Sequence, residues 1–252
     1  IMQNPVEEHR AKYPERECYG SEETTGCGTR GIYYDDPEGR WMKALNRAPN
    51  GNDSVMNCIE RGWRFYAERP WAAGCFFWTG FDYRGEPNPL KYPAVDSQFG
   101  ILDYAGFPKD EAWYLKAWWT DETVLHLLPH WNLEGHEGET VSVWAYSNCD
   151  EVELKVNGKT MGRKATPRYG HIEWDVTYQP GKLIAVGYRN GKKVKTEVVE
   201  TAGKATAIAL SADRDMIKAD NNDVAVVTVA LKDKKGRVVP TACQQLTLHL
   251  DG

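Results

Sequence analysis

The hydrophobic pattern of this chain changes near residue 125, and no single architecture accounts for both sides of that point. Before it, the sequence combines an uninterrupted apolar run over residues 72–79 with apolar side chains at helical spacing, such as Ile59, Trp63 and Tyr66. After it, apolar and polar residues alternate between short turns. The chain therefore combines a mixed α and β part with an all-β part.

The sequence before residue 125 predicts strands and helices in alternation. Strands are expected at residues 17–21 and 72–79, and helices at residues 54–68, capped by Ser54, and 110–119. The run at 72–79 lacks polar alternation, which is typical of a buried parallel strand. This order indicates βα units on a parallel sheet. Because two such units cannot close a barrel or bury both faces of a sheet, we expect this part to be incomplete by itself.

Residues 126–202 predict an antiparallel β-sandwich. Apolar residues of the run 151–156 point to one face and charged residues to the other. Asn157-Gly158 follows directly, and Asn190-Gly191 separates two further alternating runs. Asn-Gly pairs favour tight hairpins because both positions adopt positive φ readily.

A third unit is expected from residue 203, with strands at 207–210, 224–232 and 246–250 and a turn at Lys235-Gly236. Since a full sandwich takes roughly 100 residues, we expect this unit to be truncated at Gly252. Ile1 is not an initiator residue, so we expect the chain to be a piece of a longer protein.

Charge and motif content argue against several classes of protein. The 252 residues carry a formal net charge of −5, whereas nucleic-acid-binding domains usually present a basic face. No run approaches the roughly 18 apolar residues of a membrane helix. Neither a glycine-rich phosphate loop nor a Gly-x-Ser-x-Gly elbow occurs. We therefore expect no nucleic-acid partner, no membrane insertion and no cofactor.

Cysteine and histidine spacing predicts neither a disulfide framework nor a metal site. The six cysteines form no Cys-x-x-Cys pair and are expected to be ordinary buried or free thiols. His126, His130 and His136 are close in sequence, but Pro129 argues against one helix that carries the first two.

Two segments with candidate catalytic or binding residues lie where the parallel strands are expected to end. Glu22 follows the first strand, and catalytic groups of parallel βα architectures lie at such carboxyl ends. A carboxylate there can act as a nucleophile or general acid, although a solvated loop carboxylate fits the same pattern. Trp78 ends the next strand, where it can form a floor under a sugar while Asp82 or Glu86 binds hydroxyls. A core tryptophan followed by loop carboxylates is the alternative.

These segments resemble a known enzyme family. Tyr13-Pro14, Gly20-Ser21-Glu22 and residues 30–33 resemble the stretch around the seventh barrel strand of glycoside hydrolase family 2, which includes bacterial β-galactosidases. Residues 77–87, 99–103 and 106–110 resemble the eighth strand and the segment after it. Residues 146–148 and 156–159 resemble the sandwich that follows the barrel, and residues 217–220 with 239–240 resemble an invasin-type bacterial Ig-like module.

The resemblance implies a multidomain fold. Residues 1–125 would form the C-terminal part of a (β/α)8 TIM barrel, residues 126–202 an immunoglobulin-like sandwich, and residues 203–252 a truncated bacterial Ig-like domain. The implied activity is that of a retaining exo-β-glycosidase, most simply a β-galactosidase, which acts on an oligosaccharide or polysaccharide by double displacement.

The resemblance also implies roles for individual residues. Glu22 matches the nucleophile, Trp78 matches the aromatic floor of the sugar site, and Asp82, Glu86 and Arg30 are the further substrate-binding residues. The family usually has a small residue after its Ser-Glu pair, whereas Glu23 follows here, so Glu23 remains the alternative nucleophile. The acid/base of strand four has no counterpart and would lie upstream, so the chain is expected to be inactive alone.

Two other interpretations remain open. The chain is a non-catalytic carbohydrate-binding or spacer fragment, or it belongs to the same class of enzyme with β-glucuronides or β-mannosides as substrates. Ig-like modules and polysaccharide breakdown favour a periplasmic or secreted location.

Overall fold

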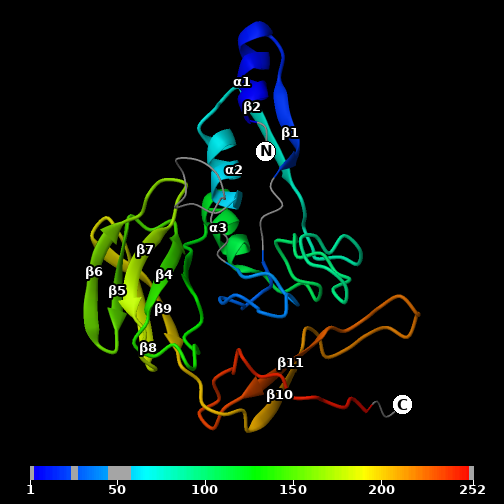
Figure 1. The fold of residues 1–252 in the computed structure, drawn as a ribbon, viewed down its shortest axis with the longest axis vertical. Coiled ribbons are helices and arrows are strands. Elements are labelled where there is room, and N and C mark those ends of the chain that lie inside the picture. The colour runs from blue at the N-terminus through cyan, green and yellow to red at the C-terminus, as the bar shows by residue number, and fades with distance from the viewer. Residues whose placement is uncertain (1–2, 24–27, 45–57, 250–252) are drawn as a thin grey trace.

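A computed structural model describes residues 3–23, 28–44 and 58–249. The described part is mainly β structure in three groups (Figure 1): an α/β group, a sandwich and a two-stranded ribbon. The helices are α1 (Gln3–Lys12), α2 (Cys58–Ala67) and α3 (Asp110–Trp119). The strands are β1 (Cys18–Glu23), β2 (Ala72–Phe77), β3 (Leu125–Leu128), β4 (Thr140–Ser147), β5 (Glu151–Val156), β6 (Lys159–Ala165), β7 (Ile172–Thr177), β8 (Lys182–Arg189), β9 (Lys192–Glu200), β10 (Ala207–Ala212) and β11 (Val227–Lys232).

In the α/β group, β1 and β2 pair in parallel, and α2 lies between them in the chain, so the predicted βα order is confirmed. Within the described residues no further strand joins this pair, and two strands do not by themselves define a barrel. Helix α3 has the predicted bounds. The expected helix start at Ser54 lies outside the described residues. Within the described residues, α2 begins at Cys58.

Helix α1 was not predicted, because its sequence has no apolar stripe to signal it. Polar contacts attach it instead. The Arg69 guanidinium pairs with Glu7 at 2.6 Å, and Arg10 lies over the ring of Trp71. Tertiary contacts of charged side chains leave no periodicity that a sequence pattern reveals.

The predicted sandwich is confirmed. Strands β3, β4 and β7 form one antiparallel sheet, and β6, β5, β8 and β9 form the other. The core between them contains Leu154, Leu183 and Trp131, none of which is exposed. Asn157-Gly158 joins β5 to β6 and Asn190-Gly191 joins β8 to β9, and all four residues have positive φ, as the hairpin signal requires.

The third group is less regular than predicted. Strands β10 and β11 pair antiparallel over six residues each, and Gly236 adopts positive φ in the turn after β11. The strand expected at 246–250 is wrong for Leu246 to His249, which are irregular and leave Leu248 exposed, while Leu250 lies outside the described residues. In the described part, β10 and β11 pair only with each other, so residues 246–249 join no sheet.

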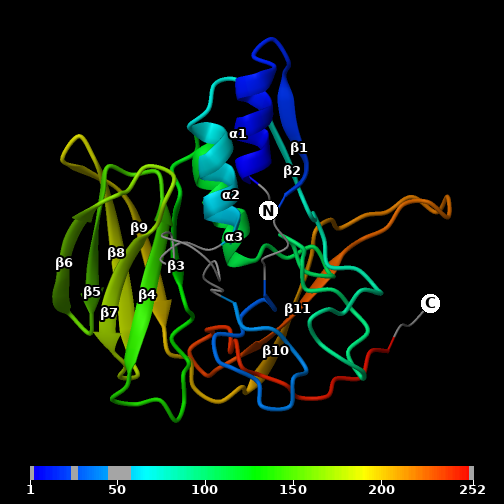
Figure 2. The same cartoon turned by 45° about the horizontal axis from the view of Figure 1, so that its top comes forward.

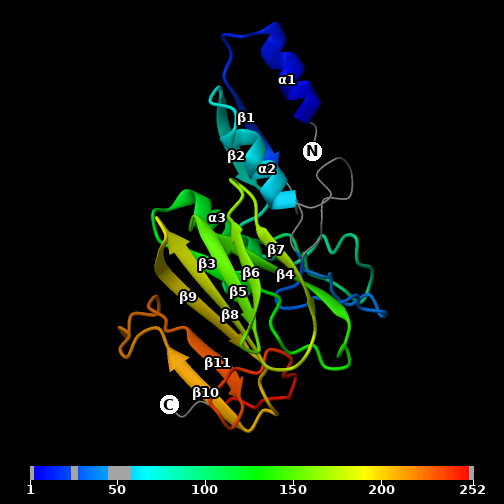
Figure 3. The same cartoon turned by 90° about the vertical axis from the view of Figure 1, so that its left-hand side faces the viewer.

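The β3–β4–β7 sheet is buried on both faces. Val143 and Ala145 point into the sandwich core, whereas Trp144 and Tyr146 belong to a second core with Ile59 of α2. Tyr114 and Leu115 of α3 complete that second core. Figures 2 and 3 show α3 against this sheet, with α2 above it. The sandwich therefore supports the α/β group through its outer sheet.

One buried and one partly buried polar contact strengthen this junction. His171 Nδ1 lies 2.7 Å from Glu60 Oε1, and both side chains are buried. The His171 ring stacks on Trp144 with 3.6 Å between centroids. On α3, Asp110 pairs with His126 of β3 at 2.8 Å and accepts a hydrogen bond from the Tyr33 hydroxyl at 2.7 Å. The buried Glu60 and the partly buried Asp110 thus each have a histidine partner, as removal of charge from water demands.

Three further observations bear on predictions made from the sequence. Cys18, Cys75, Cys149 and Cys243 are free thiols, as predicted. No described helix is both long and apolar enough to cross a membrane. Among the described residues, no three His, Cys, Asp or Glu side chains gather as a metal site would require.

The His126–Asp110 pair predicts a pH-dependent stability. Burial lowers the pKa of His126, but hydrogen bonds with Asp110 and Glu197 outweigh it and raise the pKa to about 9. Because the folded pKa exceeds the unfolded one, the contribution is complete below about pH 6.5 and is lost as pH rises through about 9. We expect the free energy of unfolding of the 252-residue chain to fall by on the order of 2 kcal/mol over that range.

Urea titrations of the wild type and of His126→Gln at both ends of this range measure the effect. The variant should lose most of the pH dependence, whereas His136→Gln, at an exposed histidine, should retain it. An identical pH dependence in His126→Gln and wild type would contradict the role of this pair.

Candidate active site

The carboxyl ends of β1 and β2 lie side by side, which brings the two segments singled out from the sequence together (Figure 1). Glu22 is the penultimate residue of β1, and Trp78 directly follows β2. The Trp78 backbone N–H donates to the Glu23 carbonyl at 2.8 Å, so the pairing of the strands continues to their last residues. The strand β1 ends two residues later than the predicted 17–21 because of this pairing.

An irregularity in β1 separates the two adjacent glutamates. Gly20 pairs with Cys75 and Glu23 pairs with Phe77, so β1 uses one more residue than β2 over this interval. Such a bulge re-aims the side chains around it. Glu22 is exposed, whereas Glu23 is only 6% exposed. The sequence alone left Glu22 and Glu23 as alternatives, and the exposure of the two favours Glu22.

Glu23 faces helix α2. The Tyr66 hydroxyl donates to Glu23 Oε1 at 2.5 Å, while Oε2 is buried and has no hydrogen-bond partner among the described residues. Burial, with the nearby Glu23 charge, raises the pKa of the Cys75 thiol to about 12. A Cβ on Gly20 would lie 2.2 Å from the Tyr66 hydroxyl, so the contact needs glycine at that position.

Trp78 is partly exposed and is held at its polar edge. Its indole N–H donates to the Tyr83 hydroxyl at 3.0 Å, and that hydroxyl donates to Glu86 Oε2 at 2.5 Å. Burial and the hydrogen bond to Glu86 raise the pKa of Tyr83. The peptide bond between Trp78 and Thr79 is cis. Trp78 and Glu86 are therefore brought together through a residue to which the sequence assigned no role.

Asp82 lies in an internal ion pair. Its Oδ1 accepts hydrogen bonds from Lys109 Nζ at 2.7 Å and from the Gly100 backbone at 2.8 Å, and both charged side chains are buried. Burial raises the pKa of Asp82, and Lys109 opposes that rise. This carboxylate ties the loop after β2 to the start of α3.

Arg30 is also engaged within the protein. Its Nε lies 2.5 Å from Asp103 Oδ2, and its guanidinium lies over the Phe107 ring. Arg30 and Asp82 line one shallow surface hollow. Sequence reasoning missed the partners Lys109 and Asp103, because opposite charges far apart in the chain give no local signal. Tyr83, in contrast, lies within residues 77–87, the segment that resembles the eighth barrel strand.

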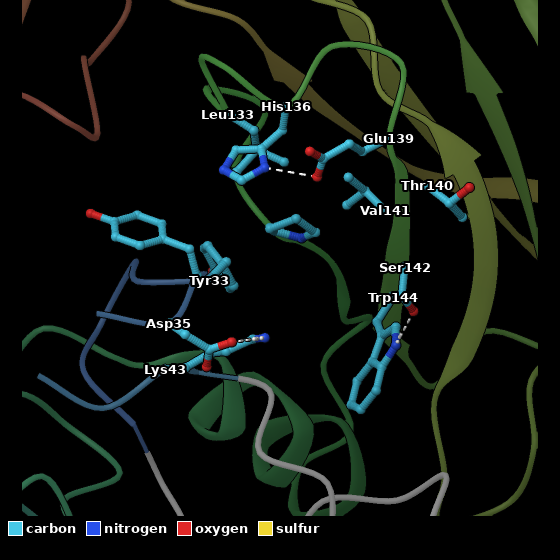
Figure 4. Close-up of a pocket in the computed structure, with 12 residues that line it drawn as sticks. Tyr33, Asp35, Lys43, Leu133, His136, Glu139, Thr140, Val141, Ser142 and Trp144 are labelled. Carbon is cyan, nitrogen blue, oxygen red and sulfur yellow. Dashed lines mark hydrogen bonds and ion pairs between the residues drawn. The ribbon is translucent and has the colours of Figure 1, made fainter. Parts of the chain in front are cut away.

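A separate pocket of about 550 Å³ lies between the segment after β1 and the sandwich (Figure 4). Tyr33, Asp35 and Lys43 face His136 and the residues around β4 across it. Each wall carries its own ion pair, Asp35 with Lys43 and His136 with Glu139. None of Glu22, Arg30, Trp78, Asp82 and Glu86 lines this pocket.

Two family models match the all-β part of the chain. Residues 138–195 match a domain of unknown function, and residues 208–252 match the glycoside hydrolase family 2 C-terminal domain 5. The second match covers the β10–β11 ribbon and the residues after it.

Curated proteins and solved structures extend the similarity to nearly the whole chain. The β-galactosidase BoGH2A of Bacteroides ovatus is 36% identical over 96% of this chain and 30% of its own length. A putative β-glucuronidase of Formosa agariphila is 33% identical over 80% of this chain and 20% of its own. A β-glycosidase structure from Bacteroides vulgatus superposes with a TM-score of 0.78 at 30% identity, over 92% of this chain and 34% of that one. The chain thus spans a third or less of the length of these curated relatives.

The Glu23–Tyr66 contact predicts a stability difference between two tyrosine variants. Tyr66→Phe leaves a buried carboxylate without its donor and should lower the free energy of unfolding by about 1–3 kcal/mol. Tyr19→Phe, at a tyrosine that is largely exposed on β1, should change it by less than about 0.5 kcal/mol. Urea unfolding of the 252-residue chain measures both, and equal effects would show that the contact contributes nothing.

Proposed function

The chain belongs to glycoside hydrolase family 2, and from this premise we propose that it carries the nucleophile of a retaining exo-β-glycosidase, with Glu22 in that role. The observation that carries the proposal is the exposed Glu22 carboxylate at the carboxyl end of a parallel strand, beside the partly exposed Trp78. Catalytic groups of parallel barrels occupy such ends.

The two faces of the β1–β2 pair support a barrel origin for residues 1–125. One face packs on α2 through Gly20 and Glu23. The other carries Tyr19 and Phe76, which are 64% and 68% exposed and contact each other edge to face. Barrel strands have helices outside and large apolar side chains inside. We infer that these two strands close a (β/α)8 barrel, followed by a sandwich over 126–202 and an Ig-like domain over 203–252.

In the proposed reaction, Glu22 attacks the anomeric carbon while an acid supplied by another part of the protein protonates the leaving oxygen. The bond from C1 to that oxygen breaks as the bond from C1 to Glu22 forms, and water then hydrolyses the glycosyl-enzyme. A retaining pair of carboxylates stands about 5–5.5 Å apart. Trp78 would stack against the apolar face of the sugar.

A β-galactoside is the proposed substrate. A glucuronide carries a carboxylate that needs a cation, and Arg30 and Lys109 near the site are already paired with Asp103 and Asp82. Arg84, exposed in the loop after β2, is the other basic residue that a glucuronide would have to use. The relatives include proteins named β-galactosidase and putative β-glucuronidase, so the sugar requires a direct comparison.

We predict that Glu22→Ala in the full-length protein lowers turnover of an aryl β-galactoside by at least about a thousandfold, because no covalent intermediate can form. Azide should restore turnover, since it enters the space of the missing carboxylate and attacks C1 from the same side. The product should then be the α-glycosyl azide. Glu23→Gln serves as the control and should keep most of its turnover. Normal turnover in Glu22→Ala, or the same loss in Glu23→Gln alone, would contradict the assignment.

A panel of aryl β-galactoside, β-glucuronide and β-mannoside tests the sugar. We expect the full-length protein to have its highest kcat/KM with the galactoside. A preference for the glucuronide would retain Glu22 as the nucleophile and overturn the choice of sugar.

A further inference from the structure

The polar edge of Trp78 belongs to a hydrogen-bond chain with a fixed direction. An indole N–H can only donate, and an ionised carboxylate can only accept. The Tyr83 hydroxyl stands between them, 3.0 Å from Trp78 Nε1 and 2.5 Å from Glu86 Oε2. Because the Tyr83 hydroxyl donates its hydrogen to Glu86, a lone pair of the Tyr83 oxygen is turned toward the indole.

The backbone holds both supporting residues in place. The Tyr83 N–H donates to Ser97 Oγ at 3.2 Å, and the Ser97 N–H donates to the Tyr83 carbonyl at 2.8 Å. Ser97 is fully buried. Gly85 and Glu86 then have φ of 90° and 49°, a left-handed turn that returns Glu86 toward Tyr83. The supporting pair is thus a fixed part of the loop after β2.

The ring geometry leaves the indole usable as a platform. The Tyr83 ring meets the Trp78 ring at 84° with 6.0 Å between centroids, so its contact is edge to face and not a stack. Trp78 remains 39% exposed. The hydrogen bond at the indole edge limits rotation of the Trp78 side chain. Because this side chain is already ordered in the free protein, ligand binding costs less conformational entropy.

We propose that Tyr83 is a positioning residue, held by Glu86, that fixes the orientation of Trp78 for stacking against the substrate sugar; this rests on the proposed function. Glu86 accordingly supports Trp78 through Tyr83 and does not bind sugar hydroxyls directly, which revises the role expected from its sequence. The Asp82–Lys109 ion pair joins the loop after β2 to the start of α3 and takes no part in the hydrogen bonds from Trp78 to Glu86.

The first test reads the hydrogen bond without any activity. In the full-length protein labelled with 15N-tryptophan, the Trp78 indole N–H signal is assigned by its loss in Trp78→Phe. Tyr83→Phe should shift this signal upfield and leave the other indole signals in place. Glu86→Gln keeps an acceptor oxygen and should stay near wild type, whereas Glu86→Ala should shift. Tyr92→Phe, at an exposed tyrosine of the same loop, is the control and should change nothing.

The second test measures the consequence in the full-length protein. Tyr83→Phe should lower kcat/KM for the aryl glycoside by roughly five- to tenfold, mainly through KM, since one hydrogen bond that orders the platform is lost. Glu86→Gln should rescue most of the activity that Glu86→Ala loses. A purely structural role would instead lower kcat and thermal stability together and leave KM unchanged.

The outcomes separate the two proposals. An unshifted indole signal in Tyr83→Phe would overturn the hydrogen-bond chain, whatever the enzyme does. A shifted signal with unchanged kcat/KM in an active enzyme would overturn the positioning role. No turnover by the wild-type protein on any glycoside of the panel would overturn the proposed function, and the substrate role of Tyr83 with it.

Discussion

The contact of His171 with Glu60, covered by Trp144, is the interaction on which the rest of the structure depends. It joins the outer sheet of the sandwich to helix α2 in the middle of an apolar core. From the same helix, Tyr66 holds Glu23 at the end of β1. Because Glu23 is anchored on that side, the bulge before it turns Glu22 to solvent. A continuous series of buried contacts thus runs from the all-β part to the candidate nucleophile.

Helix α3 provides the equivalent support for the second segment of the site. Its Asp110 is bound to the sandwich through His126, and the preceding Lys109 is bound to Asp82 in the loop after β2. That loop carries Trp78 and, through Tyr83, fixes its edge. The strand end with Glu22 and the loop with Trp78 are therefore each held by a helix that packs on the same sheet of the sandwich. Rigid supports of this kind keep a site in the geometry that its chemistry needs.

Local signals in the sequence predicted local structure well. The Asn-Gly hairpins, the alternation in β5, the strand at β2 and the bounds of α3 depend on neighbouring residues and were confirmed. The prediction that β2 is a buried strand was wrong for the described part, because only β1 pairs with it there and Phe76 is 68% exposed. The junction was not predicted, because the continuous burial of β4 comes from two cores whose other halves lie far away in sequence. The same holds for the site: the sequence places Glu22 and Trp78 at strand ends, but the partners of Arg30 and Asp82 are set by tertiary contacts. Glu86 instead contacts Tyr83, three residues before it. The choice between Glu22 and Glu23 depends on a bulge that no periodicity reveals.

The central claim is that Glu22 is the nucleophile of a family 2 glycosidase, and trapping the covalent intermediate tests it most directly. The full-length protein is treated with a 2-deoxy-2-fluoro-β-galactoside that carries a good leaving group, digested, and the modified peptide sequenced by mass spectrometry. We predict one modified residue, Glu22. A label on Glu23 or on a carboxylate outside the β1 peptide would contradict the account, because Glu23 is turned to Tyr66 and away from solvent.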